Sequence, residues 1–304
     1  MTSKQKAYAA LTATSIIWGS TWVASKIAVQ QVPGLQVSAI RQFVAGVLYV
    51  IFFTLKGEPF PKWRQLKSLL FISFFLLIIA NGLATWSIRY ISSGLGALIG
   101  ALYPLCVVVI EMVIFKTKNT LLTFVGLILG FVGIGVVFYH NAFHHASNNY
   151  LFGVVLGLIA TLAWSIGTIL VARKKININP YYSMGWQMLL ASPFLAIISM
   201  ATGQHVPLTA IPMQTWLSIA YLVLIGSCIA FACFIFSMKN LPAAISSLYA
   251  YFNPIVAMLI GAVLLHEQLT LNILIGTLIT IVGVYIVNHS MKEKPTTEPI
   301  ENEI

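Results

Sequence analysis

SIIWGSTW, residues 15–22, returns in altered form as TLAWSIGT, residues 161–168. In both stretches a tryptophan stands among small residues inside an apolar run, and Trp164 follows Trp18 by 146 positions. Weak internal similarity of this kind is the sign of a structural repeat. The two stretches therefore predict that the chain consists of two related halves, each of which begins with an apolar helix.

The composition indicates a protein that lies in a lipid bilayer. Its 304 residues are 59% hydrophobic and 8% charged, whereas a soluble globular chain carries about 25% charged residues. So few charges cannot cover a surface that faces water, so we expect most of the surface to contact membrane lipid. The net charge of +10 is explained by basic loops on the cytoplasmic side, and no nucleic acid is expected as a partner.

Apolar segments of about 20 residues, separated by short connections, predict ten membrane-spanning helices. The segments are 7–25, 36–55, 66–86, 94–115, 121–139, 151–171, 181–201, 214–236, 243–264 and 271–289. The first segment is long enough to span and is followed by many others, so we expect a membrane helix rather than a signal peptide. The polar residues 291–304 are expected to form a disordered cytoplasmic tail.

The basic residues predict the orientation of these spans. If the N-terminus lies inside, 14 of the 17 Lys and Arg residues fall in cytoplasmic segments. The other three, Lys26, Arg41 and Arg89, lie near the outer ends of helices. Cytoplasmic loops carry an excess of basic residues, so we expect an even number of spans with both termini in the cytoplasm.

Further pairs of residues extend the repeat along the chain. Beyond a four-residue insertion the shift between the halves becomes 150, and the matched pairs are Pro104 with Pro254, Leu121 with Leu271, Gly126 with Gly276, and Gly133 with Gly283. Each half holds five spans, and an odd number means that the halves enter the membrane in opposite directions. This inverted-topology repeat is characteristic of secondary transporters. We expect repeats at 1–140 and 151–290, joined by an outer loop at 141–150.

Three blocks of sequence resemble the EamA family of the drug/metabolite transporter superfamily. They are IIWGSTWVASK (16–26), YISSGLGALIGALYP (90–104) and LPAAISSLYAYFNPIVAMLIGAVLLHEQLT (241–270). The resemblance covers nearly the whole chain and implies ten helices, a bacterial inner-membrane location and transport of small metabolites. The first half departs from the pattern, because Thr117 stands where the second half has Glu267.

The two repeated tryptophans are candidates for a substrate cavity. Trp18 lies ~16 Å into its helix, near the middle of a hydrocarbon core about 30 Å thick. Interfacial tryptophans sit at the ends of spans, so Trp18 and Trp164 either line a cavity or pack where the two repeats meet. The resemblance favours the cavity, because the first helix of each half lines it in that family. Trp22 follows Trp18 by one turn, on the same helix face.

Two prolines near the centres of matched helices mark a second candidate region. Pro104 follows Tyr103, and Pro254 follows Asn253. Proline lacks the N–H that would donate to a carbonyl in the preceding turn of the helix. Within a membrane this unpaired carbonyl is tolerated only where protein or water donates a hydrogen bond to it. Paired breaks are typical of transporter binding sites, although a plain kink is the alternative. Tyr249, just before the second kink, is a further cavity candidate.

A few polar residues inside the spans complete the candidate site. Glu111 is the only acid well inside a span, so it is a candidate for proton coupling; it also lies close enough to the cytoplasmic end to snorkel or to pair with lysines. Asn81 either contacts substrate or bonds a neighbouring helix. Lys26 and Arg41 flank an outer loop, as interface anchors or as residues that attract an anionic group to the outer mouth.

Other motifs point to packing rather than chemistry. Gly126 and Gly130, like Gly276 and Thr280, predict close helix contacts within the chain or in a homodimer. The three cysteines lie in apolar runs, and the histidines 140, 144 and 145 have no acid nearby, so no disulfide and no metal site is expected. The sequence contains no nucleotide-binding loop and no nucleophile–base pair, so we expect neither a cofactor nor an enzyme.

The sequence therefore predicts an all-α secondary transporter with two inverted five-helix repeats. Its site would be aromatic and weakly polar, which favours uncharged, zwitterionic or cationic metabolites such as amino acids over phosphates, with export as the expected direction. A passive channel or facilitator is the first alternative. An intramembrane lipid-modifying enzyme is a weaker one, because it would need paired acids at one depth, and Glu111 and Glu267 are expected on opposite sides.

Overall fold

All elements described in the computed structural model are helices. The structure describes residues 2–117, 119–145, 148–174, 176–242, 245 and 248–292. Its elements are α1 (Ser3–Gln31), α2 (Gly34–Leu55), α3 (Trp63–Ser73), η1 (Phe74–Asn81), α4 (Gly82–Ser87), α5 (Ser93–Gly100), α6 (Tyr103–Phe115), α7 (Leu121–His145), α8 (Asn148–Arg173), α9 (Pro180–Ala201), η2 (Leu208–Ala210), α10 (Met213–Tyr221), η3 (Leu222–Ile229), α11 (Ala230–Asn240), α13 (Tyr249–Leu265) and α14 (Leu271–Lys292). The prediction of an all-helical integral membrane protein is confirmed.

Eight helical stretches among the described residues are long and apolar enough to cross a membrane. The helix α13 is apolar but has only 17 residues, and the 29-residue α1 does not belong to this set. Helix α1 packs against α13, α11, α10 and α5 inside the bundle. Protein therefore surrounds Thr14, Ser15, Thr21 and Ser25, which are buried, and this explains why α1 carries more polar residues than a lipid-facing span.

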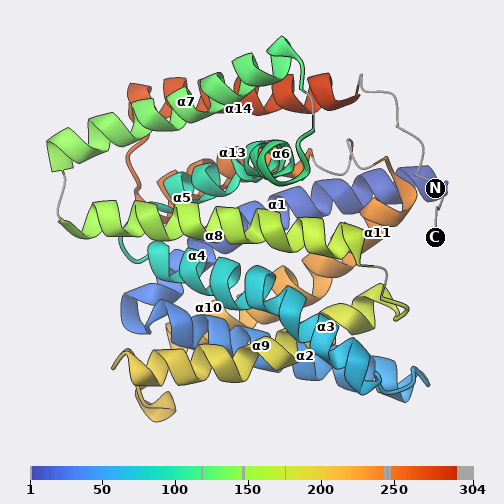
Figure 1. Cartoon of the computed structure of the whole chain (residues 1–304). Coiled ribbons are helices and arrows are strands. Elements are labelled where there is room, and N and C mark those ends of the chain that lie inside the picture. The colour runs from blue at the N-terminus through green and yellow to red at the C-terminus, as the bar shows by residue number, and fades with distance from the viewer. Residues whose placement is uncertain are drawn as a thin grey trace, which may run out of the picture.

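The helices lie side by side in a bundle with two matched edges. Figure 1 shows α7 paired with α14 at the upper edge and α2 paired with α9 at the lower edge, and both pairs are in extensive contact. Between them, α1 packs against α11 and α13, while α8 packs against η1, α4 and α6. The first helix of each half therefore contacts the third and fourth helices of the other half.

Three membrane helices depart from regular α geometry. The segments η1 and η3 are π-helical and begin 148 residues apart, inside the third helix of each half. The break predicted at Pro104 occurs at Ala101 and Leu102, between α5 and α6. No break occurs at Pro254, which lies inside α13. Pro254 is the sixth residue of α13 and cannot donate to the carbonyl of Ala250, so the helix continues without this one hydrogen bond.

One end of the bundle collects the basic connections, and we call it the basic end. Helix α1 begins there and α14 ends there, at the right of Figure 1, together with the α2–α3 and α8–α9 connections, which carry Lys56 and Lys174. Helix α7 runs to His145 and α8 begins at Asn148, so the expected outer loop is helical over most of its length. Helix α14 extends to Lys292, and the rest of the expected tail at 291–304 lies outside the described residues.

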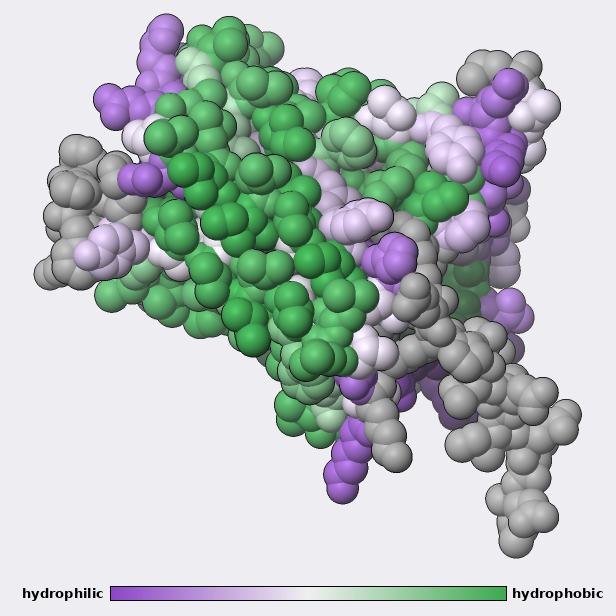
Figure 2. Space-filling model, turned by 90° about the horizontal axis from the view of Figure 1, so that it is seen from above, coloured by the Kyte–Doolittle hydropathy of each residue, from purple (hydrophilic) through white to green (hydrophobic). Residues whose placement is uncertain are grey.

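The outer surface of α7 and α14 is strongly apolar. Leu121 is 81% exposed and Leu271 is 70% exposed, with other large hydrophobic side chains between them along both helices. Figure 2 looks onto these helices from above and shows a broad hydrophobic face with hydrophilic residues at its two ends. A soluble monomer rarely exposes such a large apolar patch, whereas a surface that contacts lipid must be apolar.

Helices α7 and α14 approach each other backbone to backbone. A Cβ atom placed on Gly283 would collide with the backbone of Gly126 and Gly130, and one on Gly133 would lie 2.5 Å from the backbone nitrogen of Thr280. Small residues permit this approach between membrane helices. The small residues predicted to mediate close helix packing therefore form contacts between two helices of the same chain.

Candidate functional site

A cavity of about 160 Å³ lies between α1, α4, α5, α8 and α13. All seven residues that the sequence suggests for substrate binding line it: Trp18, Trp22, Asn81, Tyr103, Trp164, Tyr249 and Asn253. The two prolines and Glu111 are not among the lining residues. Sequence reasoning did not assign to the cavity its other polar lining residues, which are Thr21, Ser25, Arg41, Thr85, Ser87 and Thr161.

Five aromatic side chains form a cluster at one wall of the cavity. The indole of Trp18 contacts Phe231, Phe234 and Tyr249 at ring-centroid distances of 5.0, 4.9 and 5.1 Å. The ring of Tyr103 stacks on that of Tyr249 at 6.0 Å. Each such aromatic pair contributes about 0.5–1.5 kcal/mol beyond its buried area, so these ring contacts stabilise this wall of the cavity. We call these five residues the aromatic cluster.

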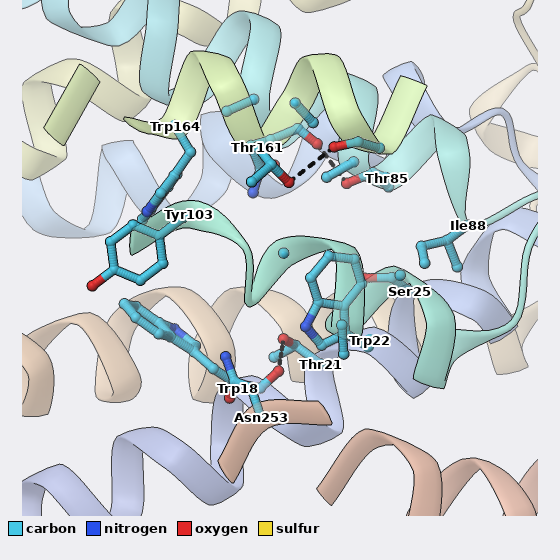
Figure 3. Close-up of a pocket in the computed structure, with 18 of the residues that line it drawn as sticks. Trp18, Thr21, Trp22, Ser25, Thr85, Ile88, Tyr103, Thr161, Trp164 and Asn253 are labelled. Atoms are coloured by element: carbon cyan, nitrogen blue, oxygen red, sulfur yellow. Dashed lines mark hydrogen bonds between the residues drawn. The ribbon is translucent and has the colours of Figure 1, made fainter. Parts of the chain in front are cut away.

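The aromatic cluster faces the basic end of the bundle. Figure 3 places Tyr103 between Trp18 and Trp164 at one end of the cavity, with Ile88 near the other end. Helix α1 begins at the basic end, so Trp18 lies nearer to that end than Ser25, which follows it along the same helix. The cavity is therefore walled by aromatic rings toward the basic end and has small polar side chains toward the opposite end.

Two glycines of α5 make room for Trp22. A Cβ atom on Gly96 or on Gly100 would come within 3.1 Å of the indole ring. At Gly96 the added atom would also collide with Ile88 Cδ1, so a larger residue at either position would require Trp22 or Ile88 to move. The spacing of these glycines thus determines the position of one cavity wall.

The π-helical segment η3 supports the site through its backbone carbonyls. A π turn leaves carbonyl groups outside the regular α-helical pattern, and buried carbonyls need hydrogen-bond donors. The indole N–H of Trp18 donates to the carbonyl of Gly226 at 3.2 Å, and the hydroxyl of Tyr49 donates to that of Cys228 at 2.7 Å. The N–H of Trp18 is therefore used within the fold, and its ring rather than its N–H is available to a ligand.

Two asparagines present polar groups to the cavity. The Oδ1 atom of Asn81 accepts hydrogen bonds from Ser38 Oγ at 3.2 Å and from Gln42 Nε2 at 3.0 Å. Asn81 thus both bonds a neighbouring helix and lines the cavity. The Oδ1 atom of Asn253 is buried and has no hydrogen-bond partner among the described residues. Because an unsatisfied buried acceptor is unfavourable, Asn253 is a natural partner for a donor group of a ligand.

Arg41 is buried inside the protein and is not exposed on its surface. The side chain is 6% exposed, lines the cavity and donates from Nε to Ser227 Oγ at 2.8 Å. The anchoring role suggested by its sequence position is wrong, because α2 turns this position toward η3. Gln187, which matches Arg41 at the shift of 146, is 4% exposed. A polar residue at the same place in both halves is the signal that could have shown this burial.

The model of the EamA-like transporter family matches this chain twice, over residues 5–139 and 151–289. The chain belongs to the EamA-like transporter family. YedA, an uncharacterized inner membrane transporter of Escherichia coli (strain K12), is 33% identical over 265 residues, which are 86% of this chain and 84% of that protein. The uncharacterized transporter YoaV of Bacillus subtilis (strain 168) is 25% identical over 272 residues, which are 89% of this chain and 92% of that protein.

A solved crystal structure shares the fold. It matches with a TM-score of 0.66 at 15% identity and covers 96% of this chain and 99% of that chain. Together with the apolar helices, the family and its relatives establish that this protein is a membrane transporter of the drug/metabolite transporter superfamily.

In this EamA-like transporter, two charged residues hold the turn between α4 and α5. Lys26 Nζ donates to the carbonyls of Ile88 at 2.9 Å and Ile91 at 2.8 Å, at the C-terminal end of α4. The carboxylate of Glu267 accepts hydrogen bonds from the backbone N–H of Ser93 at 2.8 Å and from its hydroxyl at 2.7 Å, at the N-terminus of α5. Both charges match the helix dipoles at these ends.

We predict that Glu267→Ala destabilises the protein. The change removes the charged acceptor at the α5 N-terminus, so we expect a loss of about 1–2 kcal/mol, less than for a fully buried charged group because Glu267 is partly exposed. Thermal unfolding of the purified protein measures the effect, and Gln268→Ala, at the exposed neighbouring position, is the matched control. Equal unfolding temperatures for the two variants would contradict this role of Glu267.

The described part of the chain holds no group of three or more His, Cys, Asp and Glu side chains that could bind a metal ion. The histidines 140, 144 and 145 of the connecting segment have side chains outside the described residues. The three cysteines are free; Cys106 is buried, and Cys228 and Cys233 are partly buried. Their positions within apolar helices fit the expected role of small hydrophobic residues.

Proposed function

We propose that this transporter is a secondary carrier that moves small organic metabolites across the bacterial inner membrane by alternating access, in the direction of export. The observation that carries the proposal is the cavity between the two halves, with the aromatic cluster at one end and small polar groups at the other. Secondary transporters bind substrate at such a repeat interface. The inner-membrane location is supported by the name of the Escherichia coli relative.

The proposal includes ten spans arranged as two inverted repeats, and matched backbone features support it. Residues with positive φ recur at Lys116 and His266, 150 positions apart, and at Gly57 and Gly203, 146 positions apart. The two shifts are those of the matched residues in the sequence. The π-helical segments and the paired α7–α14 and α2–α9 contacts occupy equivalent places in the two halves. The family model matches each half separately.

The proposed orientation puts the basic end in the cytoplasm, since basic loops stay inside. Both termini are then cytoplasmic, and the aromatic cluster separates the cavity from the cytoplasm. Alternating access would require α1 and α8, with the helices packed on them, to move so that the cluster opens. The cluster is the inner gate in this proposal.

Single cysteines in a variant without the three native cysteines test this orientation. Lys174→Cys, exposed after α8 at the basic end, should react with an impermeant maleimide only after the membrane is opened. His205→Cys, exposed after α9 at the other end, should react in intact cells and serves as the control. Labelling of position 174 from outside would overturn the proposed orientation.

Uptake into proteoliposomes tests the carrier itself. A carrier has a finite number of sites, so its initial rate should saturate with solute concentration for at least one metabolite of a broad panel. A passive channel would give a rate that rises linearly with concentration, because no conformational cycle limits it. Protein-free liposomes measure the background leak.

Glu111 is expected not to couple transport to protons. It lies on α6, partly exposed and outside the cavity, so a proton there would not contact the substrate. Glu111→Gln should therefore leave the pH dependence of uptake unchanged. A shifted or flattened pH profile in this variant, with normal insertion, would restore Glu111 as a proton carrier.

A further inference from the structure

The buried arginine of the cavity has a charge that the protein does not neutralise. Arg41 forms no ion pair within the described part of the chain, and no acidic residue is among those that line the cavity. An isolated charge inside a membrane protein is strongly unfavourable and marks a functional site by default. The proposed gating by the aromatic cluster does not involve Arg41.

The guanidinium also keeps most of its donors. An arginine side chain has five N–H donors in a planar fork, and the only hydrogen bond found for Arg41 among the described residues is from Nε to Ser227 Oγ, at 2.8 Å. This bond orients the guanidinium. Gly226 lets η3 approach this region closely, because a Cβ atom there would lie 2.7 Å from Thr21 Cγ2 and 3.5 Å from an Nη atom of Arg41.

We propose that Arg41 binds the carboxylate of the transported substrate, which is a small organic monocarboxylate with a compact apolar body. The proposal rests on the proposed carrier function and names its substrate class. A carboxylate matches the planar fork and can accept two parallel hydrogen bonds from it. One arginine neutralises one negative charge, so a monocarboxylate fits the site better than a doubly charged phosphate or dicarboxylate.

The rest of the cavity fits the apolar body of such a substrate. Trp22, Tyr103 and Trp164 provide aromatic walls. The cavity volume of about 160 Å³ is close to the ~150 Å³ of an engineered cavity that binds benzene. A single ring or a short branched chain attached to a carboxylate is therefore of the right size. The absence of acids among the lining residues disfavours the cationic metabolites that the sequence suggested.

Binding of matched ligands to the purified native protein tests the proposal. Benzoate and benzamide have the same shape and differ in charge, and phenylalanine and phenylalaninamide form a second pair. Of benzoate and phenylalanine, we expect the one with the higher affinity to bind about 10- to 100-fold more tightly than its own amide, as measured by titration calorimetry. This ratio is the one expected for a hydrogen bond to a charged group. Equal affinities in both pairs would overturn the proposal without any variant.

Variants assign the preference to Arg41. Arg41→Gln, which copies the residue of the matched helix, should abolish the preference for the carboxylate, and Arg41→Lys should retain part of it. Arg89→Gln removes a basic residue that does not line the cavity and should keep the full preference. An Arg41→Gln protein that elutes as a folded species and still prefers the carboxylate would overturn the assignment.

Uptake by the same proteins separates the two proposals. If the native protein and Arg41→Gln show equal saturable uptake of amides or amines, the carrier function stands, and Arg41 is not the residue that binds the substrate. If carboxylate binding depends on Arg41 but no solute shows saturable uptake, Arg41 is a carboxylate-binding residue, and the carrier function is contradicted.

Discussion

Gly283→Val is expected to prevent α7 and α14 from packing and to cause a large loss of stability. A side chain at this position would collide with the backbone of Gly126 and Gly130 on the facing helix. Backbone atoms cannot rotate away as a flexible side chain can, so the helices must separate. The loss should reach or exceed the upper end of the about 1–3 kcal/mol found for overpacked cores.

Gly135→Val is the matched control, because Gly135 lies on α7, the helix that packs against Gly283 of α14. A Cβ atom at Gly135 meets no atom within 4 Å, and this position is exposed. Thermal unfolding and size-exclusion profiles in detergent should show a folded, monodisperse Gly135→Val protein and a destabilised or aggregated Gly283→Val protein. Similar behaviour of the two variants would contradict the close contact between α7 and α14.

Trp18→Ala is expected to abolish saturable uptake. The indole makes three of the ring contacts of the aromatic cluster and donates to the Gly226 carbonyl at 3.2 Å. Its loss opens the wall between the cavity and the basic end and removes about 3–5 kcal/mol of packing energy. Trp18→Phe keeps a ring but loses the N–H, so it should retain folding and part of the transport.

Two further variants separate gating from general damage. Trp164→Ala changes a half-buried cavity residue without the ring contacts of Trp18, so it should fold and still lose most of its uptake. Trp63→Ala alters a residue that is 71% exposed at the start of α3 and should transport normally. Normal saturation in a folded Trp18→Ala protein would contradict the gating role of the aromatic cluster.

The sequence predicts the general architecture because each membrane-spanning helix must form its backbone hydrogen bonds within itself and must present apolar side chains to lipid. These rules act on local sequence, so helix positions and the match between Trp18 and Trp164 could be found without a structure. Seven residues that line the cavity could also be predicted from the sequence, whereas its other polar lining residues, Arg41 among them, could not.

Contacts between distant helices could not be predicted in the same way. The burial of Arg41 depends on how α2 is rotated against η3, and one additional residue in a π turn alters which side chains face inward. The pairing of Glu267 with Ser93 joins residues 174 positions apart. A periodicity analysis assumes regular α-helices, so it does not show the π-helical segments or the contacts that they create.

Counterflow in proteoliposomes tests the central claim most directly. Vesicles that contain the native protein are loaded with an excess of unlabelled benzoate or phenylalanine and diluted into the same solute at trace level with a radioactive label. A carrier with one cavity exposed to alternate sides should accumulate the label transiently above its equilibrium level, and Arg41→Gln should not. Label that only rises to equilibrium in the native protein, for every solute of the panel, would contradict alternating access around this cavity.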